Sequence, residues 1–240
     1  MGENEQGGML RNVTVMGLVA IIAIAIIGAT VGLTANMKSN TNSTVSKVGT
    51  NIKSTGTDSS DNSMNNLTID SDKTNVTYDY DAASHTATAT GLSNTNTLDI
   101  VIPDYIVNSG VTYKVTSIAT NAFLRKGITS VAISNSVTNI GKNAFGWNKL
   151  TNVIIPDSVS TLGDAAFIQN SLKSVTISQN LTAIGVNTFS GNQLTSVEIP
   201  LNVKTIGIGA FTGNNIAQVN ISVSVSANRA FDSSTVVNKS

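Results

Sequence analysis

The residue types that carry most enzyme chemistry are scarce in this sequence. It has no cysteine, and His85 is its single histidine. Thiolate catalysis is therefore excluded, and a histidine base would have to act from one position. No G-x-S-x-G motif marks a serine nucleophile, and no Gly-rich phosphate loop appears. We expect a protein with no enzymatic activity and no cofactor.

The carboxylates form no recognisable catalytic or metal-binding set. An alternating group lies in the first half of the chain, at Asp70, Asp72, Asp79 and Asp81, but no D-x-D-x-D-G loop with a closing Glu follows it. We interpret this group as a solvated acidic face, with a calcium site as the alternative. The later acids occupy different phases of a repeat and so form no pair: Asp157, Asp164, Glu198 and Asp232.

Charge is unevenly placed, although the net charge of the chain is zero. Residues 54–114 hold eight Asp and two Lys, a net charge of −6, whereas residues 115–240 hold eight Lys or Arg and four acids, a net charge of +4. A nucleic-acid surface needs basic residues that recur on one face. The second half of the chain has a 22-residue repeat, and its lysines fall at five different positions of that repeat: Lys126, Lys142, Lys149, Lys173 and Lys204. We expect no nucleic-acid partner.

A 22-residue period organises the second half of the chain. The stretch VTNIGKNAFGWNKLTNVIIPDS, residues 137–158, returns in modified form at residues 159, 181 and 203. A fixed period of this length is typical of a solenoid, whose stacked coils share one continuous core. The clearest members of the period are the aromatic core positions, Phe123, Phe145, Phe167, Phe189 and Phe211.

Each repeat position has an expected structural role. Residues such as Val197 and Ile199 are expected to point inward from a short strand, and each Phe into the core. Four glycines recur at one repeat position, where we expect the backbone to bend in a way that a residue with a Cβ atom could not adopt. They are Gly141, Gly163, Gly185 and Gly207. The asparagines three residues after each Phe are expected to end a short helical turn, namely Asn148, Asn170, Asn192 and Asn214. Ser or Asn at the end of each strand is expected to bond to freed backbone groups.

The consensus IGxxAF…N…L…V.IP resembles the BspA-type leucine-rich repeats of bacterial surface proteins, over about residues 100–231. The stretch LTSVEIPLN, residues 194–202, carries the L-x-x-L-x-L-x-x-N spacing of such repeats. The resemblance implies a leucine-rich repeat solenoid and a cell-surface role in adhesion or in binding a protein or glycan ligand.

The candidate ligand-binding residues lie on the turn that follows each Phe. Leu124, Trp147 and Ile168 fall on adjacent coils there, with Arg125 beside them. We expect an exposed apolar ridge, with packing of Trp147 over its own coil as the alternative. The strand face is the second candidate surface, and it is small, polar and nearly neutral.

Residues 12–37 are uncharged and long enough to cross a bilayer as a helix. We expect a membrane anchor with the repeats outside the cell, although Lys38, Lys47 and Lys53 after the helix argue against that orientation.

The leader MGENEQGG and the apolar run after it also resemble a type IV pilin-like N-terminus, which implies cleavage between Gly8 and Met9. The family's usual Glu at the fifth mature position is Val13 here. Apolar residues continue along one helix face as far as Ile52, which favours self-assembly through this helix.

The sequence thus predicts six segments. They are a leader at 1–8, a transmembrane or pilin-like helix at 9–53, a disordered linker at 54–75, a β-rich N-terminal cap at 76–114, five repeats of short strands and short helical turns at 115–224, and a truncated repeat with a C-terminal cap at 225–240. The expected function is that of a membrane-anchored surface binding protein, and the alternative is a pilin-like subunit that displays the repeats on a filament.

Overall fold

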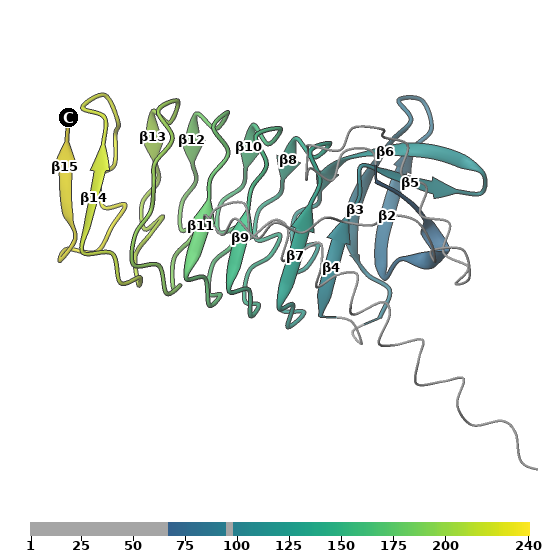
Figure 1. Ribbon diagram of the computed structural model, residues 1–240, viewed down its shortest axis with the longest axis horizontal. Coiled ribbons are helices and arrows are strands. Elements are labelled where there is room, and N and C mark those ends of the chain that lie inside the picture. The colour runs from purple at the N-terminus through teal and green to yellow at the C-terminus, as the bar shows by residue number, and fades with distance from the viewer. Residues whose placement is uncertain (1–66, 95–97) are drawn as a thin grey trace, which may run out of the picture.

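The repeats stack into an elongated solenoid with a β-sheet cap at its N-terminal end (Figure 1). The computed structural model describes residues 67–94 and 98–240. Within these residues no helix is long and apolar enough to cross a membrane. The predicted transmembrane helix, the Gly8–Met9 cleavage site and most of the predicted linker lie outside the described residues.

Most coils contribute short segments to two rows of parallel strands. One row contains β6 (Val111–Ile118), β8 (Asn139–Ile140), β10 (Thr161–Leu162), β12 (Ala183–Ile184) and β13 (Thr205–Ile206). The other contains β4 (Asp99–Ile102), β7 (Ser130–Ile133), β9 (Asn152–Ile154), β11 (Ser174–Thr176), β14 (Gln218–Ile221) and β15 (Val236–Lys239). Equivalent residues pair one coil apart, as in Val175 with Val153.

The segment around each Phe is a tight turn, so the predicted short helix is wrong. Residues 119–125 close two such turns, in which Ala122 donates to the carbonyl of Ala119 and Leu124 to that of Asn121. Alternate N–H groups instead point along the stack, and Phe123 donates to Ala144 of the next coil at 2.8 Å. Because these donors are used between coils, no i to i+4 helical ladder can form.

The predicted core is confirmed at its centre. The five repeat phenylalanines are fully buried. Their rings stack on one another with centroids 5.1 to 5.7 Å apart. Phe231 continues this column 5.1 Å from Phe211. The predicted truncated end unit is therefore a sixth coil that shares the same core.

The asparagine after each Phe joins coils and ends no helix. Asn170 donates its side-chain N–H groups to the carbonyls of Phe145 and Phe167. Its Oδ1 atom accepts the N–H of Leu150 at 3.1 Å. Asn148, Asn192 and Asn214 repeat this pattern. The result is a ladder of amides along the stack, of which the first three are buried and Asn214 is half-buried.

The repeat glycines are required by close approach between coils, and not by a bend in a left-handed backbone. None of the four has a positive φ. A Cβ atom added at Gly163 would meet the backbone of Gly141 at 2.7 Å and the backbone N of Lys142. The same clash with the preceding coil recurs at Gly141 and Gly207.

The residues at the end of each strand largely act as predicted. Ser136 donates to the carbonyl of Val115 at 2.6 Å, and Ser158 to that of Val137 at 2.7 Å. Asn180 and Asn202 likewise donate to the carbonyls of Asp157 and Gln179. These bonds reach the preceding coil, so they hold the stack together as well as the turn.

The N-terminal cap is a mixed sheet that covers the first coil. Its order is β1 (Thr68–Asp70), β5 (Tyr105–Asn108), β6, β3 (Thr86–Leu92) and β2 (Val76–Asp81). The cap and the repeats are not separated at residue 114, because β6 runs on to pair with β8 and β4 pairs with β7.

The structure also differs from the predicted linker over residues 67–75. These residues hold β1 and a 3₁₀ turn, η1 (Ser71–Lys73). Thr68 pairs with Tyr105, and the N–H of Leu67 donates to the buried carboxylate of Asp104 at 3.0 Å. The polar composition of this stretch hid its role because its partners lie 37 residues away.

Candidate binding surfaces

The turn edge of the solenoid carries an exposed aromatic–cation pair. The guanidinium carbon of Arg125 lies 5.2 Å from the ring centroid of Trp147, one coil away. The side chain of Trp147 is 40% exposed. At this distance the cation is attracted to the electron-rich face of the indole. The two residues therefore form one surface unit, in which part of the ring stays accessible to a ligand.

Leu124 and Ile168 do not extend this unit as one exposed ridge. Both are half-buried, and the glycine between them, Gly146, is buried. A Cβ atom at Gly146 would meet Ile168 at 3.1 Å and Leu124 at 3.2 Å. The two side chains thus close over the glycine and form a filled apolar column beside the indole. The predicted ridge is in fact two neighbouring columns of side chains. Leu124 and Ile168 belong to the filled column, and only the column that contains Trp147 projects into solvent.

The backbone at the Trp147 column has a conformation that favours glycine. The φ angles of Arg125, Trp147 and Gln169 are 56°, 53° and 52°. The equivalent residues of the next two coils are Gly191 and Gly213, with φ of 67° and 70°. A bulky residue in this left-handed region is strained, and such strain concentrates at functional positions. The structure therefore holds Trp147 where a glycine would serve the fold.

The charge of Arg125 is not neutralised within the described residues. Across 67–94 and 98–240, the one ion pair is that of Lys73 with Asp72, in the cap. No side-chain hydrogen bond of Arg125 accompanies its contact with Trp147 in this part of the chain. The guanidinium edge is thus available to an outside partner.

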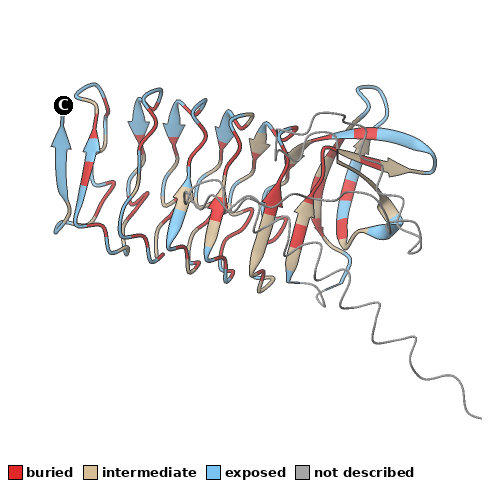
Figure 2. Ribbon diagram, viewed as in Figure 1, coloured by how far each residue is buried: buried red, intermediate tan, exposed pale blue. Residues whose placement is uncertain are grey.

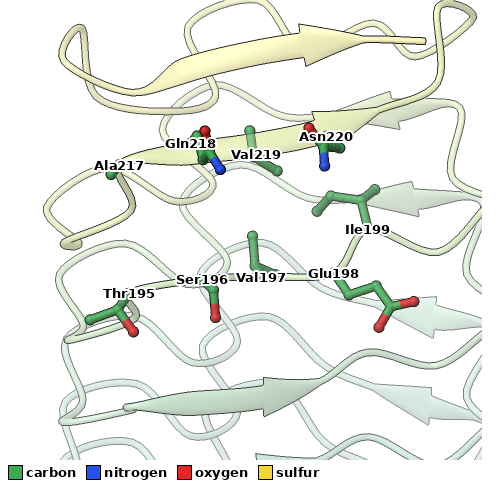
Figure 3. Close-up of a pocket in the computed structure, with 9 residues that line it drawn as sticks. All are labelled: Thr195, Ser196, Val197, Glu198, Ile199, Ala217, Gln218, Val219 and Asn220. Atoms are coloured by element: carbon green, nitrogen blue, oxygen red, sulfur yellow. The ribbon is translucent and has the colours of Figure 1, made fainter.

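A shallow groove opens on the strand face between two late coils (Figure 3). Its volume is about 450 Å³, and it is lined by residues 195–199 and 217–220. Residues 195–199 form no strand, and β14 pairs with β15 on its other side. Figure 3 shows Val197 and Val219 between the two segments, with Glu198 turned toward the preceding coil. The groove holds no aromatic or arginine side chain of the kind that dominates interface energy.

The residues considered for catalysis or metal binding are not gathered into a site. His85 stacks on Tyr113 in the cap, with ring centroids 6.0 Å apart. The Asp81 carboxylate accepts the hydroxyl of Ser84 at 2.7 Å and the N–H of Ala83 at 2.9 Å. These bonds hold the pKa of Asp81 below its usual value, with the Ser84 hydroxyl as the largest cause. Among the described residues no three His, Asp or Glu side chains could hold a metal ion together.

The contact between the Arg125 guanidinium and the Trp147 ring was not predicted from the sequence. Arg125 and Trp147 share one position of the 22-residue repeat, so their adjacency could be foreseen, but the placement of the guanidinium over the indole ring could not. A signal was available in the same alignment. Glycine at positions 191 and 213 indicates a left-handed backbone, and so marks Trp147 as unusual there.

Residues 116–238, just over half of the chain, match the family described as BspA type Leucine rich repeat region, in six copies. No functionally curated protein matches the sequence.

Several solved structures match this structure at TM-scores below 0.5. A leucine-rich cell surface protein of Faecalibacterium prausnitzii is 14% identical, with a TM-score of 0.31 over 69% of this chain and 93% of its own. The pneumococcal vaccine antigen PcpA is 18% identical, with a TM-score of 0.48 over 62% of this chain and 49% of its own. A leucine-rich repeat protein of Bacteroides ovatus is 15% identical, with a TM-score of 0.34 over 69% and 66%. On the match of its own sequence, with six repeat copies and one shared core, the chain belongs to the BspA-type leucine-rich repeat family.

Proposed function

We propose that this protein is a membrane-anchored, non-enzymatic binding protein of the cell surface, and that it mediates adhesion to a protein or glycan ligand. The observation that carries the proposal is the exposed Arg125–Trp147 pair on a rigid repeat scaffold. Trp and Arg are the residue types that most often dominate binding energy. A stack of coils joined by backbone and asparagine ladders holds such a pair in one geometry, which lowers the entropy lost on binding.

Anchoring is assigned to residues 12–37, on their length and lack of charge. The family membership supports a surface role, since BspA-type repeats are common in bacterial surface proteins. The chain between the anchor and the cap would then space the repeats from the membrane.

Protease treatment of intact cells tests this topology. We expect release of a fragment that begins within residues 54–66, because Leu67 and Thr68 are bonded into the cap and are protected from cleavage. A cytosolic protein of the same cells serves as the control for lysis. Repeats that resist shaving and become cleavable only after lysis would contradict a surface location.

A pilin-like subunit remains the second candidate, favoured by Gly8–Met9 and by the apolar helix face that runs to Ile52. N-terminal sequencing of the mature protein separates the two functions. A chain that starts at Met9 and is recovered in sheared filaments favours the subunit. A chain that starts at Met1 and stays in the membrane fraction favours the plain anchor.

A further inference from the structure

The Arg125–Trp147 pair is built to receive an anion. The guanidinium of Arg125 lies over the indole ring, and this attraction restrains the arginine side chain, whose N–H groups have no hydrogen-bond partner within the described residues. A planar guanidinium with a free edge matches a carboxylate with two parallel hydrogen bonds. Since the ring has already ordered the arginine side chain, less conformational entropy is lost when the carboxylate binds.

The surrounding charge favours the same kind of ligand. Residues 115–156, which span the coils of Arg125 and Trp147, contain four basic residues and no Asp or Glu. Two of the other basic residues are close to the pair in the chain: Lys126 follows Arg125, and Lys149 lies two residues after Trp147 and is exposed. Within the described residues none of these four cations has a carboxylate partner. The first two coils therefore present an unneutralised positive field.

The shape of the edge favours a sugar over a peptide side chain. A peptide anchor needs a pocket to fill, and the surface beside the indole is already filled, since Leu124 and Ile168 close over Gly146. A sugar ring needs only a flat aromatic surface with polar groups beside it. On the next coil, the side chain of the exposed Gln169 extends over Gly191, so its carboxamide offers N–H and C=O groups to hydroxyls farther along the same edge.

We propose that Arg125 and Trp147 bind a carboxylate-bearing sugar, a uronic or sialic acid residue of a glycan. The carboxylate pairs with the Arg125 guanidinium, the sugar ring lies against the exposed part of the indole, and Lys126 and Lys149 attract the anionic chain. The assignment rests on the proposed surface-binding function and names its ligand class.

Calorimetry on the full chain in detergent tests the proposal, with oligogalacturonate and sialyllactose as the two carboxylated probes and dextran as the neutral one. We expect binding of at least one carboxylated probe, which weakens as salt is raised, and no binding of dextran. Arg125→Lys keeps the charge and loses the two-point bond, so it should weaken binding at least tenfold. Trp147→Gly should do the same. Lys204→Gln removes one positive charge from a distant coil and should change the affinity less than twofold.

Three outcomes would overturn the assignment. They are equal binding of dextran, an affinity that Arg125→Lys leaves unchanged in a variant with the wild-type melting temperature, and tighter binding of poly-glutamate than of either sugar. The last result would identify an acidic peptide as the ligand. None of these outcomes bears on surface display, which cell shaving measures separately, so the two proposals can fail independently.

Discussion

The side-chain amide of Asn170 donates a 2.9 Å hydrogen bond to the backbone carbonyl of Phe145, a residue 25 positions earlier in the chain. The same side chain serves the carbonyl of Phe167 in its own coil and the N–H of Leu150 in the coil before. One asparagine thus satisfies three buried backbone groups at the place where two coils turn together. Because these buried groups need hydrogen-bond partners inside the protein, the amide stabilises the contact between the two coils.

Replacement of Asn170 by Leu is expected to destabilise the protein. The change keeps the volume but leaves the buried Leu150 N–H without a partner, which costs roughly 1–3 kcal/mol. It also removes one of the two amide donors at each Phe carbonyl, since Asn148 still donates to Phe145 and Asn192 to Phe167. We expect the free energy of unfolding, measured by urea denaturation of the full chain in detergent, to fall by at least about 2 kcal/mol. Gln193→Ala, at an exposed position on the neighbouring coil, is the control and should change it by less than about 0.5 kcal/mol.

Truncation of the core aromatic residues should depend on their place in the stack. Phe167 has stacked rings on both sides, 5.2 and 5.7 Å away, so Phe167→Ala should cost about 3–5 kcal/mol. Phe231 ends the described column and stacks on Phe211 alone, so Phe231→Ala should cost clearly less. Equal losses in the two variants, by the same denaturation measurement, would contradict the shared column.

Two glycine-to-alanine variants should distinguish a steric clash between coils from strain in a left-handed backbone. Gly163→Ala would drive a methyl group into the backbone of the preceding coil, which cannot move without opening the stack. Gly110 has a φ of 79° and open space around it, so Gly110→Ala should cost only the strain of a left-handed alanine, about 1 kcal/mol. We expect the melting temperature to fall further for Gly163→Ala. The reverse order would mean that the coils can separate without cost.

The fold could be predicted from sequence where it depends on the period, and less well where it depends on neighbours across coils. The spacing of the phenylalanines from Phe123 to Phe211 predicted the core, because that spacing alone implies a column of stacked rings. Gly163 and Asn170 were recognised as important but were assigned local roles. The clash at Gly163 and two of the three bonds of Asn170 involve residues 20 to 25 positions away in the chain. Strand β1 was missed for the same reason, as its partner β5 lies far along the chain and its own sequence is polar.

The turn that follows β2 should respond to acid. Hydrogen bonds from Ser84 and Ala83 hold the pKa of Asp81 below 3.8. A carboxylate with a lowered pKa in the folded state adds stability above the pKa of the unfolded chain, and that stability is lost as the pH falls through the folded value. We expect the turn to loosen below about pH 4. An NMR titration of the Asp81 carboxyl checks this, and a midpoint above 3.8 would contradict the bonded turn.

The fold should tolerate glycine in place of Trp147. Trp147 has a φ of 53°, and the same position is glycine in two later coils, so Trp147→Gly removes backbone strain of about 1 kcal/mol while it loses partly exposed contacts. We expect the free energy of unfolding to change by no more than about 1 kcal/mol. Phe145→Ala in the same coil is the contrasting variant, because Phe145 is fully buried and its loss leaves a cavity.

The wild-type tryptophan emission, from the single tryptophan of the chain, should be red-shifted and open to iodide quenching. If Trp147→Gly instead costs several kcal/mol and the emission is blue-shifted, Trp147 is a packing residue, and the strand-face groove becomes the better candidate for ligand binding.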